Sequence, residues 1–240
     1  MITVTNTKGP VFHLSPKTKA ADLLNYNWSL LSIMTRMGLK LGFGEATIGD
    51  LCRKHGVDVN TFLLVCNVYS SADYLPSQET LDEVQVAQII RYLRLSHDYY
   101  LNSALIYLER GIEKMLSPCP APRRAAVRKF FDDYCEELRK HFDFEEKNVF
   151  SYAEDLLAGA AVPGDSFSEM GDDHSNIEEK VGDLRNIVMK YLPSECETDA
   201  VTPVLTYIFH LSEDLERHTF IEDKVLVPMI KRLESEKRGR

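Results

Sequence analysis

Two stretches of the chain decide the fold: residues 138–147 read LRKHFDFEEK and residues 215–224 read LERHTFIEDK. Both have the pattern L-x-[KR]-H-x-x-x-E-[ED]-K, and their histidines and glutamates share one offset, since 218 − 141 and 222 − 145 are both 77. Two further histidines, His97 and His174, are separated by the same 77 residues. An internal repeat of this kind predicts two related pairs of helices.

The rest of the sequence favours an all-α fold. Apolar residues recur every three or four positions, and the alternating patterns typical of strands are scarce. A capping-box pattern at Thr80 and Glu83 predicts the start of the first long helix. Four long helices with short connections are typical of an up-down four-helix bundle. The expected helices cover residues 80–116, 123–157, 167–191 and 199–233, with proline- or glycine-containing segments between them.

A smaller helical region precedes the expected bundle. Residues 20–37 carry apolar side chains at helical spacing, and shorter helices are predicted at 47–55 and 58–70. The two shorter helices also fit a helix-turn-helix. DNA binding is not expected, because the chain up to residue 75 has seven Lys and Arg against five Asp and Glu. We predict a small helical N-terminal domain at 1–77 and the four-helix bundle at 78–240.

The spacing within the repeat predicts a metal site. Residues i and i+4 of a helix share a face, so each His-x-x-x-Glu pair can present an imidazole and a carboxylate to one point. The other two histidines lie near the middle of their helices, and an antiparallel bundle brings them to a comparable depth. Imidazole and carboxylate together suit iron, manganese or zinc better than magnesium or calcium. The predicted metal ligands are His97, His141, Glu145, His174, His218 and Glu222.

Composition excludes several classes of protein. Of the 240 residues, 44% are apolar and 27% charged, and the net charge of −9 argues against a general nucleic-acid binder, because phosphate contacts need a basic surface. No apolar run approaches the roughly 20 residues that span a bilayer, and the N-terminus lacks the apolar stretch of a secretory signal. The five cysteines are odd in number and show no C-x2-C spacing, so we expect reduced, mostly structural cysteines in a cytoplasmic protein.

On these motifs the chain resembles the hemerythrin-like (HHE cation-binding) domains over about residues 80–233. More narrowly, it resembles the iron-centre repair proteins, di-iron proteins linked to nitrosative and oxidative stress, which pair a small N-terminal helical domain with a hemerythrin-like bundle. This resemblance implies two non-haem iron ions, with manganese as the alternative metal, bridged by the carboxylates of Glu145 and Glu222. It also implies that nitric oxide, O2 or peroxide binds at the metals, and that damaged iron–sulfur proteins are clients.

Three departures from the family patterns bear on function. Oxygen-carrying hemerythrins have H-x-x-x-H on the third helix, where this chain has His174 and then Glu178, and they end with H-x-x-x-x-D, where this chain has His218 and then Glu222. Fewer histidines leave more open metal positions, which favours reaction or metal release over reversible O2 storage. Glu178 fits a seventh ligand, an acceptor for an imidazole N–H or a surface residue. The turn at 38–47 lacks the adjacent cysteines of the repair family, so their thiol chemistry does not carry over.

The sequence leaves several functions open. As an enzyme, the chain would be a di-iron oxidoreductase acting on nitric oxide or reactive oxygen species in a stress response. As a binding module, it would sense O2, nitric oxide or iron, with the N-terminal domain as the output. As a carrier, it would hold iron without turnover. A purely structural bundle, with its histidines satisfied in the core, would bind no metal.

Overall fold

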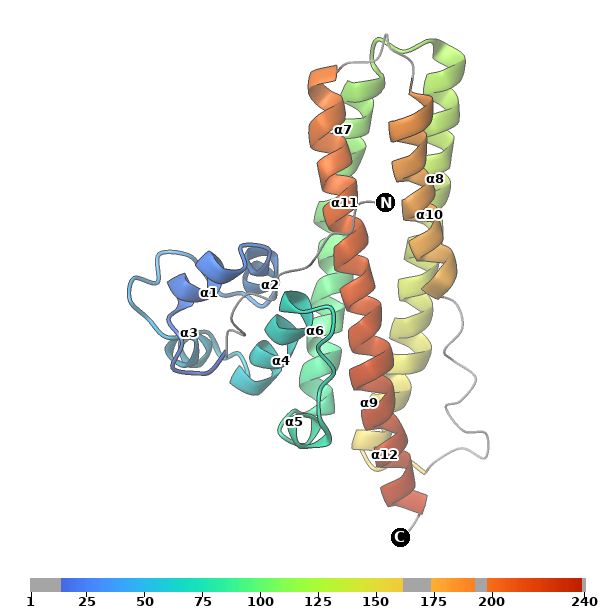
Figure 1. The fold of residues 1–240 in the computed structure, drawn as a ribbon. Coiled ribbons are helices and arrows are strands. Elements are labelled where there is room, and N and C mark those ends of the chain that lie inside the picture. The colour runs from blue at the N-terminus through green and yellow to red at the C-terminus, as the bar shows by residue number, and fades with distance from the viewer. Residues whose placement is uncertain (1–13, 162–173, 193–197, 239–240) are drawn as a thin grey trace, which may run out of the picture. The chain divides into compact units, whose positions relative to one another are not determined.

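The computed structural model describes residues 14–161, 174–192 and 198–238, and at residues 174–176, 178 and 198 only the backbone (Figure 1). Helices dominate these ranges, and the β pairing in them is an isolated bridge between Lys19 and Thr47. Contacts between residues divide the chain into two units, Met1–Tyr74 and Leu75–Arg240. Each unit has its own buried apolar side chains and is described by itself.

The first unit contains the helices α1 (Ala20–Tyr26), α2 (Leu30–Arg36), α3 (Ile48–His55) and α4 (Val59–Ser70). The prediction of one helix over residues 20–37 is therefore wrong. Asn27 ends α1 in an extended conformation, and its side-chain oxygen accepts hydrogen bonds from the backbone N–H and the hydroxyl of Ser29. Asparagine competes with the helix in this way because its short side chain can bond to the backbone nearby.

The predictions for α3 and α4 are confirmed, and both helices are capped. Thr47 and Asp50 form a capping box at the start of α3, and Asp58 accepts a hydrogen bond from the backbone N–H of Thr61 at the start of α4. Gly56 ends α3 with φ at 66°, a left-handed conformation that glycine adopts without the penalty of a Cβ atom. These caps satisfy backbone groups that would otherwise lack partners.

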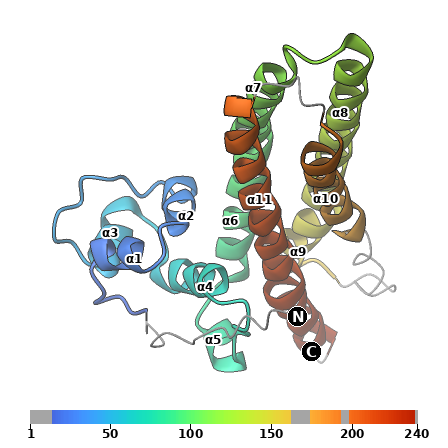
Figure 2. The same ribbon diagram turned by 45° about the horizontal axis from the view of Figure 1, so that its top comes forward.

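The second unit is a four-helix bundle built from long helical rods (Figures 1 and 2). The first rod joins α6 (Val86–Tyr99), the π-helical η1 (Tyr100–Ala104) and α7 (Leu105–Leu116). The second joins α8 (Ala121–Phe144), η2 (Glu145–Phe150) and α9 (Ser151–Leu157). The third is α10 (His174–Tyr191), and the fourth joins α11 (Thr198–Ile221), η4 (Glu222–Leu226) and α12 (Val227–Arg238). The all-α bundle predicted from the sequence is confirmed.

The first rod begins later than predicted. Ser77, not Thr80, is the capping residue: its hydroxyl accepts a hydrogen bond from the backbone N–H of Thr80 and starts the short helix α5 (Gln78–Asp82). The capping box at Thr80 and Glu83 is therefore wrong, and the rod starts after an extended residue, Gln85. The predicted start of the third helix at residue 167 lies outside the described residues.

The rods of the second unit pack through a continuous apolar core. α11 contacts both α7 and α10, and α8 contacts α10. Gly111 on α7 allows an unusually close approach, because a Cβ atom at this position would lie only 2.8 Å from Cγ2 of Val204 on α11. In the described residues, no helix is both long enough and apolar enough to cross a membrane.

One expectation about the cysteines needs correction. Cys119, in the connection between α7 and α8, is disulfide-bonded, so the expectation of reduced cysteines is wrong at this position. Its partner is none of the other described cysteines, since Cys52, Cys66 and Cys135 are free thiols. The count and spacing of cysteines do not show which of them the tertiary structure brings within bonding distance.

Candidate metal centre

Four buried side chains from the two halves of the repeat meet inside the bundle: His97 on α6, Glu145 at the start of η2, His218 on α11 and Glu222 at the start of η4. One candidate ligand atom from each lies within 4.8 Å of all the others. Both glutamates are only 4% exposed, and both histidines are buried as well. Carboxylates are almost never buried to this extent unless they are paired or bind a metal.

The Nε2 atom of His97 lies within 4 Å of the other three side chains. This nitrogen lies 3.1 Å from Nε2 of His218 and 3.3 Å from Oε2 of Glu145. Nε2 of His218 in turn lies 3.0 Å from Oε1 of Glu222, its i+4 neighbour. These contacts therefore connect the two halves of the repeat across the bundle, and the contact between His218 and Glu222 connects neighbours along one rod.

Two predicted ligands remain, His141 and His174, and the structure describes the side chain of His141 only. Nε2 of His141 lies 3.1 Å from Oε1 of Glu145, so this histidine borders the cluster, with its side chain 11% exposed. Five of the six predicted ligand residues are thus brought together. The sixth, His174, is the first residue of α10, and its side chain and that of Glu178 lie outside the described residues.

π-Helical turns occur at this place in both halves. η2 begins at Glu145 and η4 begins at Glu222, so these segments are related by the same 77-residue offset as the sequence motifs. A π-turn inserts one extra residue into a helix and is frequent at functional sites. Here the π-turn changes the direction in which the side chains after each buried glutamate point around the helix axis.

The cluster stabilises positive charge. Burial alone would lower the pKa of His97, but the neighbouring carboxylates of Glu145, Glu146 and Glu222 outweigh burial and raise it to about 10. The carboxylates thus create a negative potential at the ring nitrogen. A bound cation would meet the same potential, and the imidazole–carboxylate donor set fits iron, manganese or zinc.

A series of polar contacts fixes the other ring nitrogen of His97, Nδ1, through Glu146 and Arg94. Its Nδ1 atom lies 3.1 Å from Oε1 of Glu146, and Oε2 of Glu146 accepts a 2.8 Å hydrogen bond from Nε of Arg94. Arg94 also pairs with both carboxylate oxygens of Glu154. When Nδ1 donates to Glu146, Nε2 is the nitrogen with a lone pair for the cluster. Partners of this kind fix the tautomer and orientation of metal-binding histidines.

Aromatic rings cover the same imidazole. Phe142 stacks on His97 with ring centroids 4.0 Å apart and an interplanar angle of 14°, and Phe150 stacks at 5.4 Å and 16°. These rings exclude water from the histidine and restrict its rotation.

Sequence reasoning missed Glu146 and Arg94. The contact between Glu146 and His97 joins two different helices, which the spacing of neither motif reveals. One signal could have found it: an acidic residue comes directly after the motif glutamate in both copies of the repeat, Glu146 in the first and Asp223 in the second.

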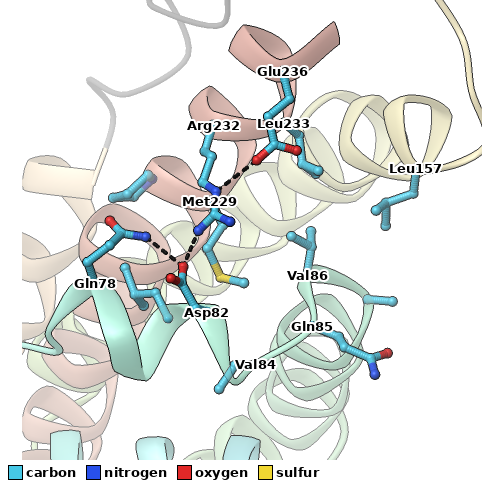
Figure 3. Close-up of a pocket in the computed structure, with 13 residues that line it drawn as sticks. Gln78, Asp82, Val84, Gln85, Val86, Leu157, Met229, Arg232, Leu233 and Glu236 are labelled. Carbon is cyan, nitrogen blue, oxygen red and sulfur yellow. Dashed lines mark hydrogen bonds and ion pairs between the residues drawn. The ribbon is translucent and has the colours of Figure 1, made fainter.

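A cavity of about 310 Å³ lies elsewhere in the second unit, lined by α5, the start of α6, and α12 (Figure 3). Its walls are mostly apolar, and Arg232 lies between Asp82 and Glu236, bonding to both. None of the cluster residues lines this cavity, and its acidic groups are already paired with a guanidinium. The buried cluster therefore remains the candidate metal centre.

A comparison with protein families agrees with this geometry. The family model described as the hemerythrin HHE cation binding domain matches residues 88–230. The chain belongs to this family. The match runs from α6 to α12 and includes every residue of the buried cluster. No curated protein and no solved structure matches the chain.

Proposed function

We propose that the bundle holds two non-haem iron ions and that the chain binds or reduces nitric oxide, O2 or peroxide, in support of the repair of damaged iron centres under nitrosative and oxidative stress. The observation that carries the proposal is the buried convergence of His97, His218, Glu145 and Glu222, with ligand atoms within 4.8 Å of one another. The repair role is supported by the resemblance of the ligand pattern to the iron-centre repair proteins.

Each protein group has a role in this proposal. Glu145 lies between His97 and His141, and Glu222 lies beside His218, so these two carboxylates would hold the ions together with the histidines. By the repeat, His174 is the fourth histidine. When bound, the two ions supply open coordination positions and electrons for small ligands. Phe142 and Phe150 keep water away, and Glu146 holds the Nδ1 proton of His97.

The test is a comparison of metal content with consumption of nitric oxide. Protein purified without oxygen should contain about two iron ions per chain, as carboxylate-bridged bundle sites do, and should consume nitric oxide in excess of protein when a reductant is supplied. Stoichiometric binding without consumption would favour a sensor. Tight iron without any response to nitric oxide would favour a carrier, and manganese in place of iron would correct the metal. A chain with no metal would contradict the proposal.

A further inference from the structure

A chain of tyrosine rings leads from the candidate metal centre to the protein surface. Tyr100 is fully buried and meets His218 edge-on, with ring centroids 5.4 Å apart and an interplanar angle of 89°. Tyr99 is next, with its ring 5.6 Å from that of Tyr100 and its hydroxyl 3.5 Å from that of Tyr207 on α11. The Tyr207 ring lies 4.5 Å from Tyr107 on α7, and Tyr107 is 57% exposed.

The innermost ring of this chain has a proton acceptor. The hydroxyl of Tyr100 donates to Oδ1 of Asp214 at 3.0 Å and lies 3.2 Å from the backbone carbonyl of the same residue. A phenol that loses an electron must also lose its proton to give a neutral radical, and a carboxylate at hydrogen-bond distance can take that proton. Further along, burial and the hydrogen bond with Tyr99 raise the pKa of Tyr207 above its ordinary value, so its phenol stays protonated.

Another buried tyrosine shows that such an arrangement is not a general feature of this core. Tyr134 on α8 is as deeply buried as Tyr100, but its hydroxyl has no hydrogen-bond partner among the described residues. Burial raises its pKa, and no base in the described part of the chain is placed to accept its proton. Tyr134 is therefore a packing residue, whereas Tyr100 combines contact with a candidate ligand, a proton acceptor and a continuous series of rings.

We propose that Tyr100, Tyr99, Tyr207 and Tyr107 form a relay for single electrons between the metal centre and the surface, with Asp214 as the proton acceptor. This inference rests on the proposed function, since it needs a redox-active metal beside His218. The contacts between neighbouring rings are short enough for an electron to pass in steps, and the exposed Tyr107 is where an external reductant can reach the relay.

The chemistry balances with hydrogen peroxide as oxidant and a small thiol as reductant. Hydrogen peroxide takes up two electrons and two protons, its O–O bond breaks, and two water molecules form. Two phenols each lose one electron and one proton and become phenoxyl radicals. At the surface, two thiols return one electron and one proton each, and the two resulting thiyl radicals combine into a disulfide. The net reaction reduces one peroxide to water and oxidises two thiols.

Electron paramagnetic resonance after rapid freezing tests the relay. The full chain is loaded with iron, the iron is oxidised to the ferric state and its content is measured. Hydrogen peroxide is then added without thiol, so that the electrons come from phenols and not from ferrous ions. We expect a tyrosyl radical signal that decays when thiol is added. Tyr100→Phe and Asp214→Asn should lose the signal at unchanged iron content. Tyr107→Phe should keep the signal but slow its decay by thiol, because the exposed end is removed.

Matched controls separate the relay from general oxidation. Tyr191→Phe removes a phenol that is as exposed as Tyr107, and Tyr134→Phe removes a buried one, and neither should change the signal. Asp214→Asn keeps the test valid if Tyr100→Phe fails to fold. Iron-loaded protein that forms no radical, or an equal radical in Asp214→Asn, would overturn the relay and leave the proposed function standing. Protein that takes up no metal would overturn both.

Discussion

The Nε2 atoms of His97 and His218 lie 3.1 Å apart, although 121 residues separate these histidines along the chain. Only one proton fits between two imidazole nitrogens at this distance, so at least one lone pair points into the cluster. Glu145 and Glu222 add two buried carboxylates to the same space. Such a convergence of donors in an apolar core is costly without a cation and is explained by one.

Removal of either motif glutamate should disrupt the proposed pair of metals. In Glu145→Ala and Glu222→Ala we expect fewer than two metal ions per chain and an altered optical spectrum, because each loses a carboxylate placed beside the cluster histidines. Metal analysis by mass spectrometry measures the effect. Glu136→Ala is the matched control, since Glu136 lies on the same rod but is exposed and pairs with Lys140. Two ions and an unchanged spectrum in Glu145→Ala would refute its bridging role.

Glu146 should tune metal affinity without being a ligand. Glu146→Ala removes the acceptor of the His97 Nδ1–H, and the loss of such a partner typically weakens metal binding by about 10–100-fold. Glu146→Gln keeps an acceptor oxygen and should have a smaller effect. Competition with a chelator measures both affinities.

The control for Glu146 is another acidic partner of an arginine. Glu113→Ala breaks the contact with Arg128, which involves none of the cluster residues, and should leave the affinity unchanged. Equal affinities in Glu146→Ala and the unmodified chain would show that the hydrogen bond does not position His97.

Replacement of two helix glycines by alanine should change the free energy of unfolding in opposite directions. Gly182→Ala on α10 has room, because the nearest atom to the new Cβ would be a flexible Arg185 nitrogen at 3.8 Å, and should raise the free energy of unfolding by about 0.5–1 kcal/mol. Gly111→Ala gains the same propensity but meets Val204 at 2.8 Å. Overpacking typically costs about 1–3 kcal/mol, so a net loss is expected. Denaturant unfolding measures both, and stabilisation by Gly111→Ala would contradict the close packing of α7 on α11.

The free thiols of the first unit should not affect the metal. Burial raises the pKa of Cys52 to about 11 and that of Cys66 above its ordinary range, so both stay protonated at neutral pH, and thiols bind metals as thiolates. Cys52→Ser and Cys66→Ser should therefore leave the metal content per chain unchanged. A loss of iron in either variant would show that these thiols take part in metal binding.

The bundle and most of the cluster were predictable because their signals are local. The helical periodicity of the apolar residues predicted the four rods. The i, i+4 spacing predicted that His141 and Glu145, and likewise His218 and Glu222, share a helix face. The repeat then related the two halves. His97 was found by the same offset, although no local motif surrounds it.

The features that escaped prediction depend on competition or on tertiary contacts. Asn27 breaks a helix whose apolar pattern continues, because its side chain bonds to Ser29. The π-turns at Glu145 and Glu222 leave the spacing of the motif unchanged and alter only the helical phase of the residues after it. The hydrogen bond from His97 to Glu146 joins two helices, which a single sequence pattern does not show.

Metal content per chain in protein purified without oxygen, together with the optical spectrum before and after nitric oxide is added, tests the central claim most directly. We predict about two iron ions per chain, held by the His and Glu side chains of the bundle core, and a visible band that nitric oxide changes. A chain without metal, or with a single zinc ion and no response to nitric oxide, would contradict the di-iron centre.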